Sequence, residues 1–201
     1  MELDVIAATF LLIVPVELPD KTFVATLVLS ARFRPFFVWV GVGAAFLVQT
    51  LVAVTAGQLA TLLPEWVLLS VAALIFTVGA VVLLLTARNA DVAEREQEEE
   101  FSHKAPDGRS GWRAAGASFL VLFAAEWGDL SQLLTMSQVA RTHEPVSVFI
   151  GAWSALLLVS GLAVVAGRVL LRYMRLSVLH YVGAGVCALF AVLTVIDLAG
   201  V

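Results

Sequence analysis

The chain has 201 residues, of which 61% are hydrophobic, and its mean hydropathy is +0.97. A soluble domain of this length could not bury so much apolar surface, because its surface-to-volume ratio is too high, so lipid must be part of its solvent. The net charge of −4 comes largely from one loop, and no basic stripe with interleaved aromatic residues indicates nucleic-acid binding.

Six hydrophobic segments predict an all-α integral membrane protein, at about 20 residues per bilayer crossing. The acidic start of the chain and its long first apolar segment do not fit a signal peptide, so we expect this segment to remain as a membrane span. We expect spans at Val5–Ala31, Phe36–Leu63, Trp66–Ala87, Ala114–Ala140, Val146–Val169 and Val178–Ala199.

The longest polar stretch divides the chain into two halves. We expect a first three-helix repeat at residues 1–87, an acidic linker at 88–113 and a second three-helix repeat at 114–201. Ten Lys and Arg residues lie in the first, third and fifth loops, whereas the other loops contain only Arg141. The positive-inside rule therefore predicts a cytoplasmic linker and two extracytoplasmic termini. With three spans per half, the second half enters the membrane in the opposite sense.

The two halves also align residue by residue. The segment Glu17-Leu-Pro-Asp-Lys-Thr22 matches Glu126-Trp-Gly-Asp-Leu-Ser131, and Pro35 and Gly41 match Pro145 and Gly151. Small residues recur at helix interfaces in any membrane bundle, so the glycine matches alone also fit ordinary packing. The ordered set favours an inverted-topology repeat, whose substrate site lies near the midplane where the halves meet.

Four acidic residues lie near the middle of the first and fourth spans: Glu17, Asp20, Glu126 and Asp129. Each costs about 2.5–3.5 kcal/mol at the centre of a membrane helix and normally marks an ion or proton path. Three positions separate Glu from Asp, so on one helix both carboxylates address one site. A structural alternative is that Lys21 neutralises Glu17 or Asp20. The second half has Leu130 in place of Lys21, so its pair lacks a local cation.

Oxygen ligands suit Ca²⁺, Mn²⁺ or Mg²⁺, and the spans contain no cluster of His or Cys. On a straight helix, Thr22 lies about 160° around the axis from Asp20, so it joins the site only if the helix unwinds. Pro15, Pro19 and Gly128 favour such a break. Neutral oxygens are also available at Thr22, Ser131, Gln132 and Gln49.

The charge of the site suggests its mechanism. Four carboxylates and Lys21 give the fully ionised site a charge of −3. Such crowding in a low dielectric favours proton binding when the site is empty, and a divalent cation replaces those protons. Cation–proton antiport is therefore a hypothesis from charge balance.

The doubled motif resembles the Gdt family of manganese/calcium–proton antiporters. The resemblance covers nearly the whole chain and implies metal-site roles for Glu17, Asp20, Glu126 and Asp129, with Thr22 and Ser131 as supporting polar groups. Two residues depart from the family pattern. Pro19 stands where the first motif has glycine, and Leu130 where the second has a basic residue.

We therefore expect a transporter without catalytic residues or a permanently bound cofactor, which exports Mn²⁺ and/or Ca²⁺ across the cell membrane in exchange for protons. Its expected partners are the cation, protons and lipid; no obligatory protein partner is predicted, and a monomer or homodimer suffices. The rival hypotheses are an intramembrane carboxylate enzyme such as an aspartyl protease, an exporter of small organic cations, and a non-transporting assembly factor. We expect Asp197, near the outer end of the last helix, to be solvated.

Overall fold

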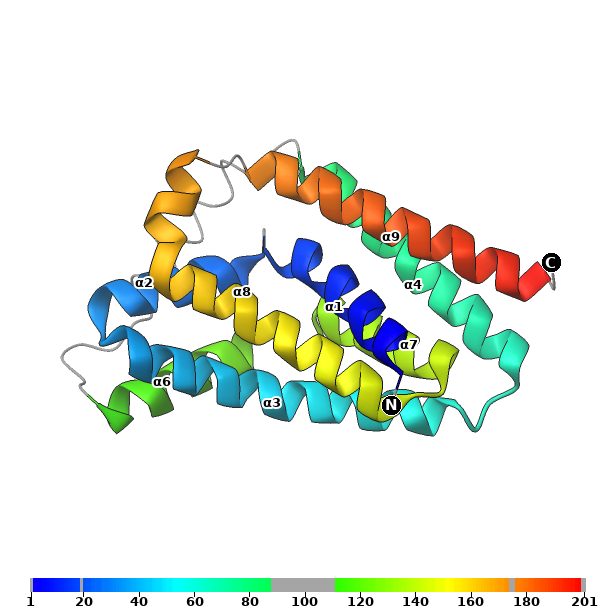
Figure 1. Ribbon diagram of the computed structural model, residues 1–201, viewed down its shortest axis with the longest axis horizontal. Coiled ribbons are helices and arrows are strands. Elements are labelled where there is room, and N and C mark those ends of the chain that lie inside the picture. The colour runs from blue at the N-terminus through cyan, green and yellow to red at the C-terminus, as the bar shows by residue number, and fades with distance from the viewer. Residues whose placement is uncertain (1, 19, 88–110, 174–175, 200–201) are drawn as a thin grey trace.

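The computed structural model describes residues 2–18, 20–87, 111–173 and 176–199, and all regular structure in these ranges is helical. Most of the predicted linker at 88–113 lies outside the described residues. Figure 1 shows long helices lying side by side along the molecule, with the ends of the chain on one side. The helices are α1 (Leu3–Glu17), α2 (Lys21–Arg32), α3 (Pro35–Ala60), α4 (Glu65–Thr86), α6 (Trp112–Ala125), α7 (Leu130–Thr142), α8 (Pro145–Tyr173) and α9 (Leu176–Ala199).

Four segments of the described helices are long and apolar enough to cross a membrane: Pro35–Ala60, Trp66–Thr86, Pro145–Val165 and His180–Ala199. They fall within the second, third, fifth and sixth predicted spans, except that Pro35 and Pro145 each precede the predicted start by one residue. The first and fourth predicted spans are not continuous helices. Each is divided in two, α1 with α2 and α6 with α7, and each piece alone is shorter than the roughly 20 residues of one crossing.

The helices of the two halves pack in a reciprocal pattern. Helix α3 packs along α6 and α7, α8 packs along α1 and α2, and α4 pairs with α9. In Figure 1 the corresponding elements run in opposite directions, since the colours show α3 running from left to right and α8 from right to left. The long second helix of each half therefore packs against the broken helix of the other half.

Two glycines explain how closely these helices approach. A Cβ at Gly41 would clash with the backbone oxygen of Ala115, and one at Gly151 would lie 2.6 Å from the backbone oxygen of Ile6. Gly41 and Gly151 are equivalent in the repeat alignment, and so are Ala115 and Ile6. The same small-residue contact is thus made twice, as expected where membrane helices pack without a hydrophobic driving force.

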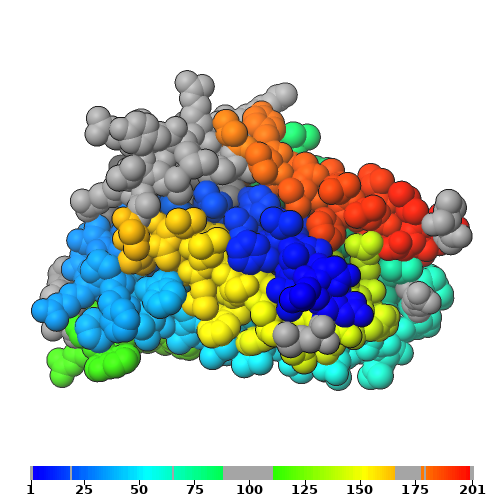
Figure 2. Space-filling model, in the orientation of Figure 1, coloured from blue at the N-terminus to red at the C-terminus, as the bar shows by residue number. Residues whose placement is uncertain are grey.

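The surface of the bundle carries many large apolar side chains. Val165 is 87% exposed and Leu85 68%, whereas Leu12, Phe76 and Leu122 in the core are fully buried. In Figure 2, α1 lies across α8 on the visible face and α9 follows one edge. An apolar exterior around a packed core suits a protein that is surrounded by lipid.

Candidate cation site

Two similar helix breaks form the site. Helix α1 ends at Glu17 and α6 ends just before Glu126. In each break the backbone N–H of the aspartate donates to the carbonyl of the glutamate, at 3.0 Å for Asp20 and 3.2 Å for Asp129. Gly128 has φ +79°, a conformation that favours glycine. The breaks predicted from Pro15, Pro19 and Gly128 are therefore present at both motifs, although Pro19 itself lies outside the described residues.

The two breaks bring the four predicted carboxylates together. One carboxylate oxygen from each of Glu17, Asp20, Glu126 and Asp129 lies within 4.8 Å of those of the other three. Glu17 and Glu126 are each only 1% exposed, and the two aspartates are partly buried. A spacing this short suits one ion bound by oxygens from both halves of the chain.

The three-residue spacing predicts that the two carboxylates of a motif lie on successive turns of one helix. In the structure they do not. Asp20 and Asp129 are instead the N-cap residues of α2 and α7, with extended backbones. The Asp20 Oδ1 atom accepts a hydrogen bond of 2.7 Å from the backbone N–H of Lys21. The four carboxylates cluster as predicted but with a different geometry, because the chain leaves the helix between Glu and Asp in each motif.

Lys21 crosses from one half to the other. Its Nζ atom lies 2.9 Å from Oδ1 of Asp129 and 4.0 Å from Oε1 of Glu126. The structural alternative paired Lys21 with its own Glu17 or Asp20. The close ion pair of the ammonium group is with Asp129, while its charge also acts on Asp20 and Glu17. Lys21 thus reaches the second carboxylate pair, which has Leu130 in place of a local lysine.

Three carboxylate oxygens at the centre of the site have no hydrogen-bond partner among the described residues. They are Oε1 of Glu17 and both side-chain oxygens of Glu126. A buried charge without a partner costs several kcal/mol, so we expect these oxygens to bind protons or a cation. The donor set is made of oxygen atoms only, which suits a hard divalent ion.

A hydroxyl group supports one of the glutamates. The Thr22 Oγ1 atom donates to Oε2 of Glu17 at 2.9 Å, and the Ser131 side chain of the other half lies near this carboxyl group. Thr22 reaches the site because α2 begins anew after the break, which removes the 160° separation expected on a straight helix of about 3.6 residues per turn.

The two predicted glutamines lie beside the cluster and are engaged with the backbone. The Gln132 amide nitrogen donates to the Glu126 carbonyl at 2.8 Å, and its oxygen accepts from the Gly128 N–H at 3.3 Å. Gln132 therefore braces the second break. The Gln49 amide nitrogen donates at 3.1 Å to the carbonyl of Phe123, in the last turn of α6.

Two side chains have roles that differ from, or were missed by, the sequence predictions. Asp197 is not simply solvated, because its Oδ2 atom accepts hydrogen bonds from Nε and Nη2 of Arg141 at 2.9 and 2.7 Å. Thr50 was not singled out, yet it is 2% exposed and lines a small cavity with Gln49 and Ser131. Thr50 is equivalent to Ser160 in the repeat alignment, and this repeated hydroxyl was the sequence feature that could have identified it.

A buried ring of carboxylates between broken membrane helices defines a secondary transporter of cations. The comparisons with known proteins agree with this class. The family model described as "Divalent cation/proton antiporter GDT1" matches residues 5–91 and 114–200, one segment on each side of the central linker. The chain belongs to this family, whose members are transporters and not enzymes.

Individual relatives span plants and a cyanobacterium. The "GDT1-like protein sll0615" of Synechocystis is 29% identical over 96% of this chain and 97% of its own length. "Protein PAM71, chloroplastic" of Arabidopsis thaliana is 30% identical and "GDT1-like protein 1, chloroplastic" of Oryza sativa subsp. indica 26%, again over 96% of this chain. The chain spans 56% and 62% of the lengths of these two plant proteins. No solved structure matches.

Proposed function

We propose that this protein exchanges Mn²⁺ and/or Ca²⁺ for protons and exports the metal from the cytoplasm. The observation that carries the proposal is the buried cluster of four carboxylates, three of whose oxygens have no partner among the described residues. Two three-span repeats of inverted topology would then enclose one site near the midplane, to which each repeat gives a Glu and an Asp.

The charge of the cluster supports exchange rather than simple uptake. The fully ionised carboxylates and Lys21 carry a charge of −3, which cannot persist in a buried site without protons or a cation. A divalent ion that enters the cluster neutralises most of this charge and displaces the protons. Because both species need the same oxygens, they occupy the site in turn, which couples their movements.

Direct metal ligation is assigned to Glu17, Asp20, Glu126 and Asp129. Supporting or charge-balancing roles go to Lys21, Thr22, Ser131, Gln132 and Gln49, whose contacts hold the carboxylates or the helix breaks. One chain completes the cluster, so a monomer is sufficient for transport and a homodimer is compatible with it.

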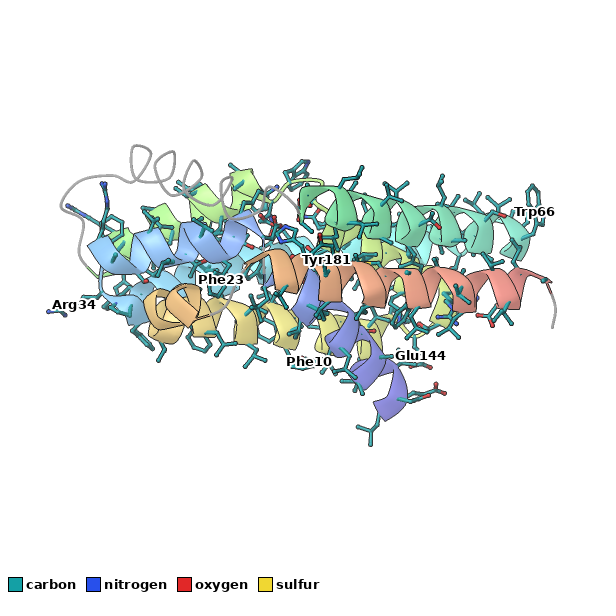
Figure 3. The ribbon with its side chains drawn as sticks, turned by 90° about the horizontal axis from the view of Figure 1, so that it is seen from above. Phe10, Phe23, Arg34, Trp66, Glu144 and Tyr181 are labelled. Carbon is teal, nitrogen blue, oxygen red and sulfur yellow. The ribbon has the colours of Figure 1, made fainter. Side chains whose placement is uncertain are left out.

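The proposed location is the cell membrane, with the segment 88–113 in the cytoplasm and both termini outside. The support is the basic bias of the first, third and fifth loops. Figure 3 places Arg34 and Trp66 at opposite ends of the molecule, as expected for residues at the cytoplasmic and outer ends of the second and third spans. The plant relatives are named chloroplastic, which describes those proteins.

The test is transport by the purified protein in liposomes with a pH-sensitive dye inside. We expect Mn²⁺ or Ca²⁺ to move against protons, and the double variant Asp20→Asn/Asp129→Asn to move neither. The proposal fails if neither ion moves, or if an ion moves without protons in return. Movement of an organic cation alone would favour the exporter hypothesis, and activity of the double variant in cells without transport would favour an assembly factor.

A further inference from the structure

The broken helices lead away from the carboxylates along two equivalent interfaces with different chemistry. One lies between α3 and α7 and the other between α8 and α2. Residues of α7 spaced by four and three, Ser131, Thr135 and Gln138, share one helix face. With Gln49 and Thr50 of α3 they form what we name the polar column, and each of the five side chains is at most 5% exposed.

The polar column contains space and unsatisfied polar atoms. A cavity of about 10 Å³ lies within it, close to the volume that one water molecule needs. The Thr50 hydroxyl and the Gln138 side-chain oxygen have no hydrogen-bond partner among the described residues, although these side chains are only 2% and 1% exposed. Buried polar atoms are normally satisfied by protein or by ordered water, so the Thr50 hydroxyl, which lines the cavity, indicates a place for water. The Thr26 hydroxyl of the equivalent interface is also unsatisfied, so the cavity and the glutamines, and not the unsatisfied hydroxyl, distinguish the polar column.

The equivalent interface between α2 and α8 keeps its hydroxyls and loses every glutamine. In the repeat alignment Val159 replaces Gln49, Phe23 replaces Gln132 and Leu29 replaces Gln138. Phe23, Val159 and Ala163 form a buried apolar cluster, and Phe23 is only 1% exposed. The ring of Phe23 lies in the half of the molecule that ends at Arg34 (Figure 3).

The far end of the polar column is closed by backbone packing and not by a bulky side chain. A Cβ at Gly57 of α3 would lie 2.8 Å from the backbone oxygen of Met136 and 2.9 Å from Cβ of Val139, both in α7. A small separation of α3 from α7 is enough to open this end of the polar column. Opening the other interface requires the Phe23 ring to leave its apolar cluster and face water, which is costlier.

We infer that protons and water reach the carboxylates from the extracytoplasmic side along the polar column, while Phe23 is the apolar gate of the cytoplasmic side. The inference rests on the proposed function for its transported species and for its sidedness. Along the described helices, the polar column follows α7 from Asp129 toward Arg141, and Phe23 lies on α2 between Asp20 and Arg32. The two routes occupy equivalent positions in the two repeats. They differ in what must move to open them: two helices at the polar column and the Phe23 ring at the other interface.

Matched cysteine variants test the inference. In a Cys187→Ala background, Thr50→Cys and Gln138→Cys are compared with their repeat equivalents Ser160→Cys and Leu29→Cys. A small charged methanethiosulfonate is applied to intact cells and to inverted vesicles. From outside, we expect the first pair to react at least about tenfold faster than the second, which corresponds to roughly 1.4 kcal/mol in the free energy of local opening.

Equal rates in the two pairs, or reaction of the first pair only in inverted vesicles, would overturn the inference. Labelling requires no transport, so a protein that labels as expected but moves no ion in liposomes contradicts the proposed function alone. Variants that do not elute as folded protein from a sizing column are replaced by Thr135→Cys and Thr26→Cys, another equivalent pair, with the same expected result.

A second experiment opens the gate. Phe23→Gln gives α2 the residue that α7 has at the equivalent position, and it should make the cysteine introduced for Leu29 reactive from inverted vesicles. We expect about a tenfold gain in rate there, since one buried aromatic ring no longer has to be moved into water. No gain in a folded variant would show that Phe23 is only a core residue.

Discussion

The two repeats share two packing contacts and a backbone hydrogen bond, and they differ in the side chains around the carboxylates. Gly41 against Ala115 and Gly151 against Ile6 are the same contact made twice. Both breaks contain the same hydrogen bond from the aspartate N–H to the glutamate carbonyl. The frame of the site is therefore symmetric, and its position between the halves follows from the packing of each long helix on the other half's broken helix.

The charges and the access routes are not symmetric. Lys21 has Leu130 as its equivalent, and Leu130 packs toward Gly79 of α4 instead of joining the cluster. Gln132 braces its break, whereas its equivalent Phe23 fills an apolar cluster. The comparison indicates that a duplicated frame holds the ion, while the residues that differ set the charge of the empty site and the side from which it is reached.

The largest expected effect comes from removing one charge from either half. Glu17→Gln and Glu126→Gln should each weaken binding of Mn²⁺ or Ca²⁺ by more than the ~10–100-fold that is typical of outer-shell partners of a metal site. Glu126→Gln should lose more, because both Glu126 oxygens lack a partner whereas Thr22 holds one oxygen of Glu17. Calorimetric titration of the purified protein measures the affinities.

The exposed carboxylate Asp4 provides the control, since Asp4→Asn changes the same charge far from the cluster in sequence. It should bind the cation as the unmodified protein does. Wild-type affinity in Glu17→Gln or Glu126→Gln would show that the repeats do not share one site, and the symmetric frame would then have no functional meaning.

The next effect concerns the single cation. Lys21→Met should make the empty site hold more protons at a given pH, because its ammonium group lies 2.9 Å from Asp129 and no other described cation contacts the carboxylates. Two opposite unit charges 4 Å apart attract each other by about 4 kcal/mol at an effective dielectric constant of 20. Binding of a divalent cation should therefore release more protons per ion, up to about one more, which a pH dye in weakly buffered detergent solution measures.

The exchange Lys21→Leu/Leu130→Lys is the matched comparison. It preserves the total charge and moves the cation to the other repeat, so proton release per ion should return toward the wild-type value. If Lys21→Met releases as few protons as the wild type, Lys21 does not contribute to the charge balance of the site.

The sequence was sufficient to predict which carboxylates cluster, but not which hydrogen bonds and ion pairs they form. Four carboxylates in apolar segments are costly wherever they lie, and their repetition predicts that they converge. The geometry depended on where the chain leaves the helix. Glycine and proline indicated a break, but only the break itself places Asp20 as an N-cap and brings Thr22 to Glu17.

The partner of Lys21 shows why the rest was inaccessible. Asp20 is its neighbour in sequence, yet it is the backbone N–H of Lys21 that bonds Asp20, while the ammonium group reaches Asp129, 108 residues away. A side chain this long finds its partner through the relative placement of α2 and α7. That placement follows from close contacts of whole helices, which no local pattern encodes.

A smaller effect is expected at the contacts that hold the symmetric frame. Gly41→Ala and Gly151→Ala each place a methyl group against a backbone oxygen that cannot move freely. We expect each to lower the stability by about 1–3 kcal/mol, or the melting temperature in detergent by roughly 3–10 °C. Gly116→Ala is the control, because a Cβ there would meet no other atom within 4 Å and helix propensity favours alanine.

The two glycine variants should cost similar amounts if the repeats are structurally equivalent. A loss confined to one of them would mean that only one of the two long helices is held by this contact. A loss as large in Gly116→Ala would show that the loss does not come from the close helix contacts, because that substitution creates no such contact and helix propensity favours alanine.

The smallest effect concerns the ion pair between Arg141 of α7 and Asp197 of α9. The Asp197 side chain is 46% exposed and the Arg141 side chain 19%, so solvent screens much of the attraction even though two hydrogen bonds align the groups. Exposed pairs contribute about 0.2–1 kcal/mol, so Asp197→Asn should lower the melting temperature by no more than roughly 1–4 °C, and less at high salt. Arg32, the repeat equivalent of Arg141, is exposed and forms no ion pair with any residue the structure describes, so Arg32→Gln should leave the melting temperature unchanged. If both variants shift the melting temperature equally, the ion pair does not distinguish the repeats, and the difference between them is confined to the surroundings of the carboxylates.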